Sequence, residues 1–179
     1  VSVDPLEQLR VKTGIVPRSA VLCHGTLRED MQWGKKNATD DEIYEALKTA
    51  QALEFVEEKD EGLELYIQAG GKNLPGGQRQ RLTLARALVR QPEILLMDDS
   101  ASALAFATDA RLRKAIKERT QDMTVFIVSQ RATTIRNADQ IVVLDDGAMV
   151  GCGTHKELFE NCEIYREICL SQLSKEEVQ

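Results

Sequence analysis

Two groups of residues have the types and spacing of a site for phosphate and metal. Gly76 and Gly77 open an amphipathic run, and the apolar stretch 94–97 is followed directly by Asp98 and Asp99. Because glycine has no Cβ, a ligand can approach its backbone closely. The first turn of a helix adds free N–H groups and the positive end of the helix dipole. Carboxylates that end a buried strand suit a magnesium ion carried on a nucleotide, so the order of these features predicts a nucleotide site.

Strands and helices alternate around these residues. Thr13–Val16, 94–97 and Thr124–Val128 have the apolar, β-branched character of strands, whereas 78–90 and 104–119 repeat apolar residues at helical spacing. This order predicts a parallel sheet with covered faces. The arginines of the helix 78–90 are expected on its outer face: Arg79, Arg86 and Arg90.

The segment 26–73 has helical signals and no convincing strand, which predicts a helical subdomain. Within it, Thr39 and Glu42 have the spacing of a capping box at the start of a helix. Further along, Asp146-Gly147 stands between two apolar runs and predicts a hairpin turn. Thr154 predicts the cap of the helix that follows.

Composition limits the classes of protein that are possible. The 179 residues are 42% hydrophobic and 29% charged, which is typical of a globular protein with one core. A net charge of -6 argues against a nucleic-acid partner. No apolar run reaches the length that spans a bilayer, so no transmembrane segment is expected in this chain. The four cysteines lack CxxC spacing, which favours free thiols over a zinc site or disulfides.

One long segment carries a family resemblance. The residues NLPGGQRQRLTLARALVRQPEILLMDDSASAL resemble the signature-to-Walker-B core of an ATP-binding cassette (ABC) nucleotide-binding domain, whose usual signature is LSGGQ. The stretches VPRSAVLCHGTLREDMQWG and ATDDEIYEALKTAQA resemble the exporter branch of that family. The resemblance implies an α/β fold, namely a partial P-loop NTPase-like parallel sheet core with a helical subdomain. Residues 1–25 would hold a core strand and the Q-loop region, 26–73 the helical subdomain, and 74–179 the signature helix, Walker B and the C-terminal core.

The phosphate-binding P-loop of this family is missing from the sequence. It requires GxxxxGK[ST], and the Gly-Lys pairs at Gly34 and Gly71 do not fit that pattern. In the family this loop precedes the strand that begins here near Thr13. We therefore expect the chain to be a fragment or a truncated copy of the domain, without the primary phosphate cradle.

The resemblance assigns roles to four retained residues. Gly76, Gly77 and Gln78 would lie against the nucleotide of a partner domain. Asp98 matches the Walker B aspartate and would hold magnesium, as hard carboxylate oxygens do.

Five other positions depart from the family pattern, and all of them belong to the γ-phosphate machinery. Asp99 replaces the catalytic glutamate and is one methylene shorter, so its reach as a general base is reduced. Gln130 replaces the switch histidine and cannot carry the charge of an imidazolium. Arg18 replaces the Q-loop glutamine and could sit on phosphate as a cation. Ala105 replaces the D-loop aspartate, and Pro75 replaces the signature serine, which removes a hydroxyl and an N–H.

This pattern resembles the degenerate half of a heterodimeric ABC exporter. ATP and Mg²⁺ would bind only in a composite site with a second nucleotide-binding domain, and the chain alone is expected to have no ATPase activity. Coupling loops of a membrane domain would contact the neighbourhood of Gly25 to Trp33. The chain would then lie at the cytoplasmic face of a membrane, held peripherally by that membrane domain.

Three alternatives remain open at the level of sequence. The chain could be a non-catalytic interaction module that binds a partner domain and no nucleotide, or a decayed remnant without function. A soluble ABC ATPase of DNA repair or chromosome upkeep would need long heptad runs or basic patches, and the sequence has neither.

Overall fold

A computed structural model describes residues 6–100, 102, 104–119 and 122–172, and it divides into two units, 1–128 and 129–179. The elements of the first unit are α1 (Leu6–Lys12), β1 (Thr13–Val16), β2 (Gly25–Thr26), α2 (Leu27–Gly34), α3 (Asp40–Thr49), α4 (Leu53–Glu57), η1 (Gly62–Glu64), β3 (Tyr66–Ile67), η2 (Ala69–Gly71), α5 (Gly76–Leu88), β4 (Ile94–Asp98), α6 (Phe106–Arg119) and β5 (Thr124–Val128). Those of the second unit are α7 (Ala132–Ile135), β6 (Ile141–Asp145), β7 (Ala148–Gly153), α8 (His155–Asn161) and α9 (Glu163–Gln172). Among the described residues, no helix has the length and apolar character needed to cross a bilayer.

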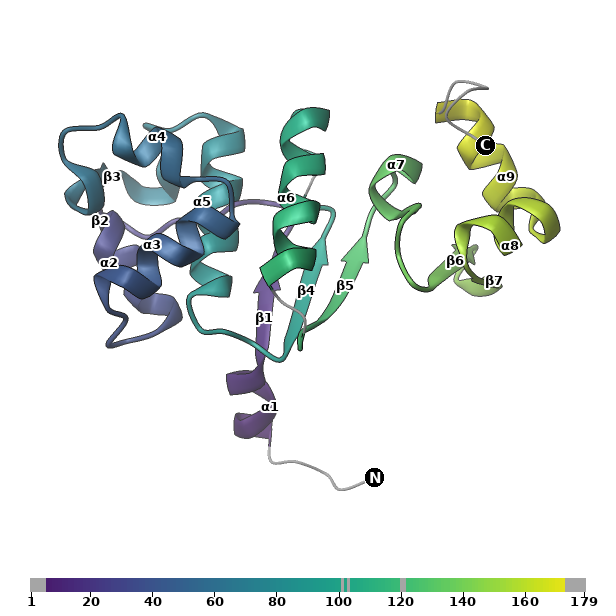
Figure 1. Ribbon diagram of the computed structural model, residues 1–179, viewed down its shortest axis with the longest axis horizontal. Helices are drawn as coiled ribbons and strands as arrows, with labels where there is room; N and C mark the ends of the chain where they lie inside the picture. The colour runs from purple at the N-terminus through teal and green to yellow at the C-terminus, as the bar shows by residue number, and fades with distance from the viewer. Residues whose placement is uncertain (1–5, 101, 103, 120–121, 173–179) are drawn as a thin grey trace. The chain divides into compact units, whose positions relative to one another are not determined.

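Three parallel strands, in the order β1-β4-β5, form the core sheet of the first unit (Figure 1). The predicted parallel sheet is therefore confirmed. One face of the sheet packs into the core through Val16, Leu95 and Met97. The prediction that both faces are covered is wrong, because on the opposite face Ile15 is 61% exposed and Phe126 56%. The apolar character of a strand shows that it prefers burial, but it does not show what lies over each face.

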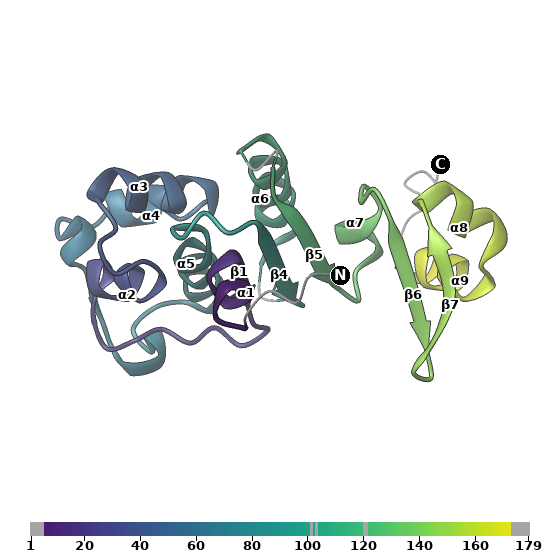
Figure 2. The ribbon, with the colours of Figure 1, turned by 90° about the horizontal axis from the view of Figure 1, so that it is seen from below.

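The helices α2, α3 and α4 form a helical lobe beside α5, away from β5 (Figures 1 and 2). The predicted capping box of α3 is present, since Thr39 accepts from the Glu42 amide and Glu42 accepts from the Thr39 amide. One expectation about the segment 26–73 is wrong, because a short antiparallel pair joins β2 to β3. Two-residue strands this far apart in sequence leave no periodic pattern that could be read in advance.

The helix α5 is buried on more of its circumference than its apolar stripe predicts. Leu82 and Ala85 are buried as expected, and Gln80 and Thr83 are buried as well, each at 2% exposure. Arg86 is not the outward-facing arginine that the pattern predicts, because its guanidinium pairs with a fully buried carboxylate on α2. This helix therefore connects the sheet to the helical lobe by polar as well as apolar contacts.

The second unit has its own small core, in which α8 and α9 pack against the β6-β7 hairpin. The predicted Asp-Gly turn is confirmed, since Asp146 and Gly147 have φ values of 44° and 77°, as a mirror-image hairpin turn requires. Tyr165 is 1% exposed, and its hydroxyl lies 2.8 Å from His155 Nδ1. Burial is the main cause that raises the pKa of the Tyr165 phenol.

Candidate functional site

The end of β4 exposes one of the two predicted acids and buries the other. Asp98, the last strand residue, is exposed and pairs in register with Val128, whereas Asp99 is 8% exposed. The backbone of Asp99 has φ 42°, in the left-handed region that aspartate tolerates better than most residues. Its N–H donates to Val128 O at 2.8 Å, and its carbonyl accepts from the hydroxyl of Ser102, also at 2.8 Å. These bonds fix the direction of the chain directly after the strand.

Arg18 lies next to this corner and contacts the Asp99 carboxylate. The distance from Arg18 Nε to Asp99 Oδ2 is 3.3 Å, and the side chains are 65% and 12% exposed, respectively. Arg18 follows β1, the strand that pairs with β4, so the sheet itself places these residues together. The structure thus joins two of the residues that the sequence assigned to the site.

The signature residues begin α5. Pro75 is the N-cap, with extended backbone and no side-chain hydrogen bond, and its carbonyl accepts from the amides of Gln78 and Arg79 at 3.0 Å each. The amides of Gly76 and Gly77 therefore precede the first donors inside the helix, where helix geometry leaves N–H groups for an external acceptor. A Cβ built on Gly76 would meet nothing closer than Arg79 Nη2 at 3.8 Å. The fold itself therefore does not require glycine at this position.

The remaining predicted residues lie at element boundaries. Ala105 is exposed and precedes α6, where its carbonyl accepts from the amides of Thr108 and Asp109 at 3.0 Å each. Gln130 belongs to the second unit and is exposed. Its carbonyl accepts from Gln172 Nε2 at 2.8 Å, which ties it to α9.

Two polar residues near the site were missed by the sequence analysis. Gln80 donates from Nε2 to Pro17 O at 2.9 Å, so it fixes the residue before Arg18. Helical spacing offered a signal, because Gln80 shares a face with Thr83, Leu84 and Ala87, and all four are buried. Within the described part of the chain, the buried hydroxyl of Ser100, next to Asp99, has no hydrogen-bond partner.

The residues present fit a magnesium nucleotide in part. No group of three or more His, Cys, Asp or Glu side chains in the described ranges could hold a metal alone. Magnesium does not need such a cage, since it usually binds one or two carboxylates together with phosphate oxygens and water. The exposed Asp98 carboxylate and the unpartnered Ser100 hydroxyl are donors of the required hard type. The chain's own residues would supply the carboxylate and the helix N-terminus, and they offer no P-loop lysine.

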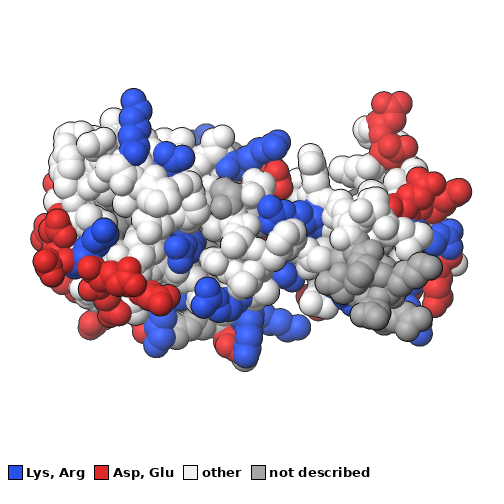
Figure 3. All heavy atoms as spheres, turned by 90° about the horizontal axis from the view of Figure 1, so that it is seen from above, with Lys and Arg blue, Asp and Glu red and all other residues white. Residues whose placement is uncertain are grey.

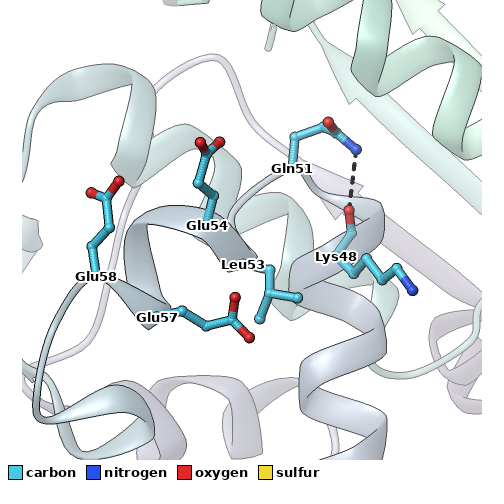
Figure 4. Close-up of a pocket in the computed structure, with 6 residues that line it drawn as sticks. All are labelled: Lys48, Gln51, Leu53, Glu54, Glu57 and Glu58. Atoms are coloured by element: carbon cyan, nitrogen blue, oxygen red, sulfur yellow. Dashed lines mark hydrogen bonds between the residues drawn. The ribbon is translucent and has the colours of Figure 1, made fainter.

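An acidic hollow lies elsewhere, on the helical lobe. It has a volume of about 520 Å³ and is lined mainly by α4 and the end of α3, with three glutamates and one lysine among its residues (Figure 4). Gln51 Nε2 donates to Lys48 O at 3.2 Å on its edge. Acidic side chains gather over this lobe on the molecular surface (Figure 3). None of the predicted site residues lines this hollow.

The parallel sheet, the glycine-led helix α5 and the acids at the end of β4 together define an α/β nucleotide-binding domain. Comparison with known proteins agrees, because the family model described as "ABC transporter" matches residues 2–102. The chain therefore belongs to the ABC transporter family, as a nucleotide-binding domain of the exporter type.

Similar proteins share most of this chain. It is 44% identical over 172 residues to the uncharacterized ABC transporter ATP-binding protein YfiB of Bacillus subtilis, a match covering 96% of this chain and 30% of that protein. It is 40% identical to the probable multidrug resistance ABC transporter ATP-binding/permease protein YheI of the same organism, covering 91% of this chain and 28% of that protein.

A solved structure described as a bacterial Atm1-family ABC exporter with ATP bound is similar with a TM-score of 0.92 and 30% identity, over 98% of this chain and 31% of that one. The chain thus spans about a third of the length of the relatives it matches.

Proposed function

We propose that this chain contributes to a composite ATP site in a dimer of nucleotide-binding domains that powers export across a membrane. Gly76, Gly77 and Gln78 at the start of α5 would contact the nucleotide held mainly by the partner, and Asp98 would hold its own magnesium. The observation that carries the proposal is the start of α5, where two glycine amides precede the first intrahelical donors and a Cβ on Gly76 would meet no close neighbour. The fold would accept a small side chain at position 76, yet the residue there is glycine. Glycine lets a phosphate approach the backbone closely.

We further propose that this is the degenerate half of such a dimer. Asp99, Gln130, Ala105 and Pro75 each lack a group that hydrolysis of the γ-phosphate would use, and Arg18 takes the place of the Q-loop amide. An arginine paired with the acid that would activate water opposes general-base catalysis. The chain alone is therefore expected to turn over no ATP.

The second proposed partner is a membrane domain. It would hold the chain at the cytoplasmic face of a membrane. The proposed contact region runs from Gly25 to Trp33. Trp33 on α2 is 75% exposed, and together with Arg86 and Arg90 it lines a hollow of about 130 Å³. An exposed tryptophan beside a hollow is typical of a surface for another protein.

The test of the composite site is equilibrium dialysis with Mg-ATP, with and without a catalytically competent exporter nucleotide-binding domain. We expect additional bound ATP only in the mixture. Gly76→Ala should weaken that binding by roughly tenfold, since a methyl group would block the phosphate. The same change should leave the free energy of unfolding equal or slightly higher, because alanine suits a helix better than glycine.

One control sharpens this experiment. The Mg-ATP turnover of the chain alone should stay at the buffer rate. Clear hydrolysis would contradict the degenerate assignment. No additional bound ATP in the mixture, beyond what the competent domain binds alone, would instead favour a non-catalytic interaction module. Additional binding that Gly76→Ala leaves unchanged would contradict the role of the start of α5.

A further inference from the structure

The Asp99 carboxylate already has a cation, supplied by its own chain. Arg18 Nε lies 3.3 Å from Asp99 Oδ2, and the Asp99 side chain is only 12% exposed. Removing a carboxylate from water is costly unless a group of opposite charge lies close to it. The Arg18 guanidinium is such a group, and it lies beside Asp99.

The loop that carries Arg18 is fixed at both ends by α5. Gln80 Nε2 donates to Pro17 O at 2.9 Å, and Arg86 Nη2 donates to Val21 O at 2.7 Å. Only three residues, 18–20, lie between these two points, and Gln80 is itself 2% exposed. The backbone around Arg18 is therefore held against α5, and its largely exposed side chain contacts the Asp99 carboxylate.

Asp99 is held equally firmly on the other side of the pair. Its amide donates to Val128 O and its carbonyl accepts from the Ser102 amide, at 2.8 and 3.1 Å. Because both backbones are fixed, forming the pair restricts only the two side chains. The contact between Arg18 and Asp99 is thus built into the fold.

We propose that Arg18 is a positioning residue that occupies the Asp99 carboxylate and lowers the affinity of the Asp98-Asp99 pair for a divalent cation when no nucleotide is bound. The proposal rests on the proposed function only in assigning Asp98 to a magnesium site. The Arg18 guanidinium would repel a divalent ion on Asp98. The Asp99 carboxylate would not be available to that ion, because it already pairs with Arg18. The chain's own arginine therefore weakens divalent-cation binding at this site in the absence of nucleotide.

The test uses Mn²⁺ as the probe, with no nucleotide and no partner. Paramagnetic broadening of the amide signals of residues 98–100 reports the local affinity, apart from any Mn²⁺ on the acidic helical lobe. We expect Arg18→Met to raise that local affinity by about tenfold, the loss of one positive charge a few ångströms from a divalent ion. Arg18→Lys keeps the charge and should bind Mn²⁺ as the unchanged chain does.

Two further variants separate a local effect from a change in net charge. In an Asp99→Asn background, Arg18→Met should give only a small gain, because the carboxylate that it frees is gone. Arg90→Met removes one charge from the same unit and should leave the affinity at residues 98–100 unchanged. Far-ultraviolet circular dichroism of each variant shows whether it folds, and Arg18 is exposed enough that its replacement should be tolerated.

The proposal is overturned by equal Mn²⁺ affinity with and without Arg18, by a gain that persists in Asp99→Asn, by an equal gain from Arg90→Met, or by no local binding in any variant. None of these outcomes decides whether ATP binds with a partner. The composite-site proposal and this one therefore fail by different measurements.

Discussion

At the scale of single residues, the most constrained charge in the first unit is Asp30 on α2. It is 0% exposed, and its Oδ1 accepts from Arg86 Nη1 at 2.9 Å and from the Cys23 amide at 2.7 Å. Its other oxygen, Oδ2, has no hydrogen-bond partner in the described part of the chain. Burial raises the pKa of Asp30 above its usual value, while the Cys23 amide and the Arg86 charge act in the opposite direction. Ionised Asp30 therefore depends on Arg86.

Replacing Arg86 with methionine should destabilise the protein in a pH-dependent manner. A buried carboxylate without its partner costs about 3 kcal/mol of unfolding free energy at pH 7. The folded pKa is raised, so the stability linked to protonated Asp30 is present below about pH 4 and is lost as the pH rises through the folded pKa. The loss in Arg86→Met should therefore be smaller at pH 5 than at pH 7, as measured by urea unfolding.

Arg90→Met is the matched control for this experiment. Arg90 lies shortly after Arg86 in the sequence, and its Nη2 donates to the backbone carbonyl of Arg10 at 3.2 Å. Its replacement should cost little at either pH. Equal losses at pH 5 and pH 7 for Arg86→Met would show that the ionisation of Asp30 does not matter.

The candidate site residues could be predicted from the sequence, whereas most of the residues that they contact could not. The positions of Asp98, Gly76 and Gly77 followed from local order along the chain. The pairing of Arg18 with Asp99, and the burial of Gln80, depend on strands and helices that meet only in the folded sheet. These tertiary contacts decide whether an arginine pairs with phosphate or with a carboxylate.

At the scale of elements, local signals at helix starts are read reliably from sequence. Three helices, α2, α3 and α8, are each preceded by an N-cap threonine and have glutamate at the third helical position, and each has a complete capping box. Every contact in such a box lies within four residues, so no tertiary information is needed. The β2-β3 pair is the opposite case, because its two short strands are joined only by the fold.

Removing the α3 cap should cost a predictable amount of stability. Thr39→Ala deletes the oxygen that accepts from the Glu42 amide, at 3.3 Å, and should lower the unfolding free energy by about 1 kcal/mol. Thr39→Ser keeps the oxygen and should stay close to the unchanged protein. Circular dichroism at 222 nm during urea unfolding measures both, and equal stability of the two variants would contradict a capping role.

At the scale of the whole molecule, the core sheet of the first unit presents an apolar face to solvent. Ile15, Phe126 and Val128 are 61%, 56% and 62% exposed, and the register of the strands places them on the face opposite to Leu95 and Met97. Contiguous exposed apolar surface of this kind binds other apolar groups. The sequence predicted the strands and their parallel order, and it could not predict which face would remain open.

This open face should bind an apolar fluorescent dye. Phe126→Thr combined with Val128→Thr should lower the fluorescence of bound anilinonaphthalene sulfonate by roughly half, while β-branched threonine keeps the strand. Leu170→Thr on α9, where leucine is 55% exposed outside this face, is the control and should change the signal little. Undiminished dye fluorescence in the double variant would place the binding elsewhere.

The two hydrogen bonds from α5 to the loop after β1 couple the movement of that loop to the helix. Gln80 donates to Pro17 O and Arg86 donates to Val21 O, so the same helix binds that loop at two places. The same helix begins with Gly76 and Gly77, which we propose contact the nucleotide of a partner domain. A displacement of the first turn of α5 would therefore also move this loop, and with it the Arg18 guanidinium beside Asp99 at the end of β4.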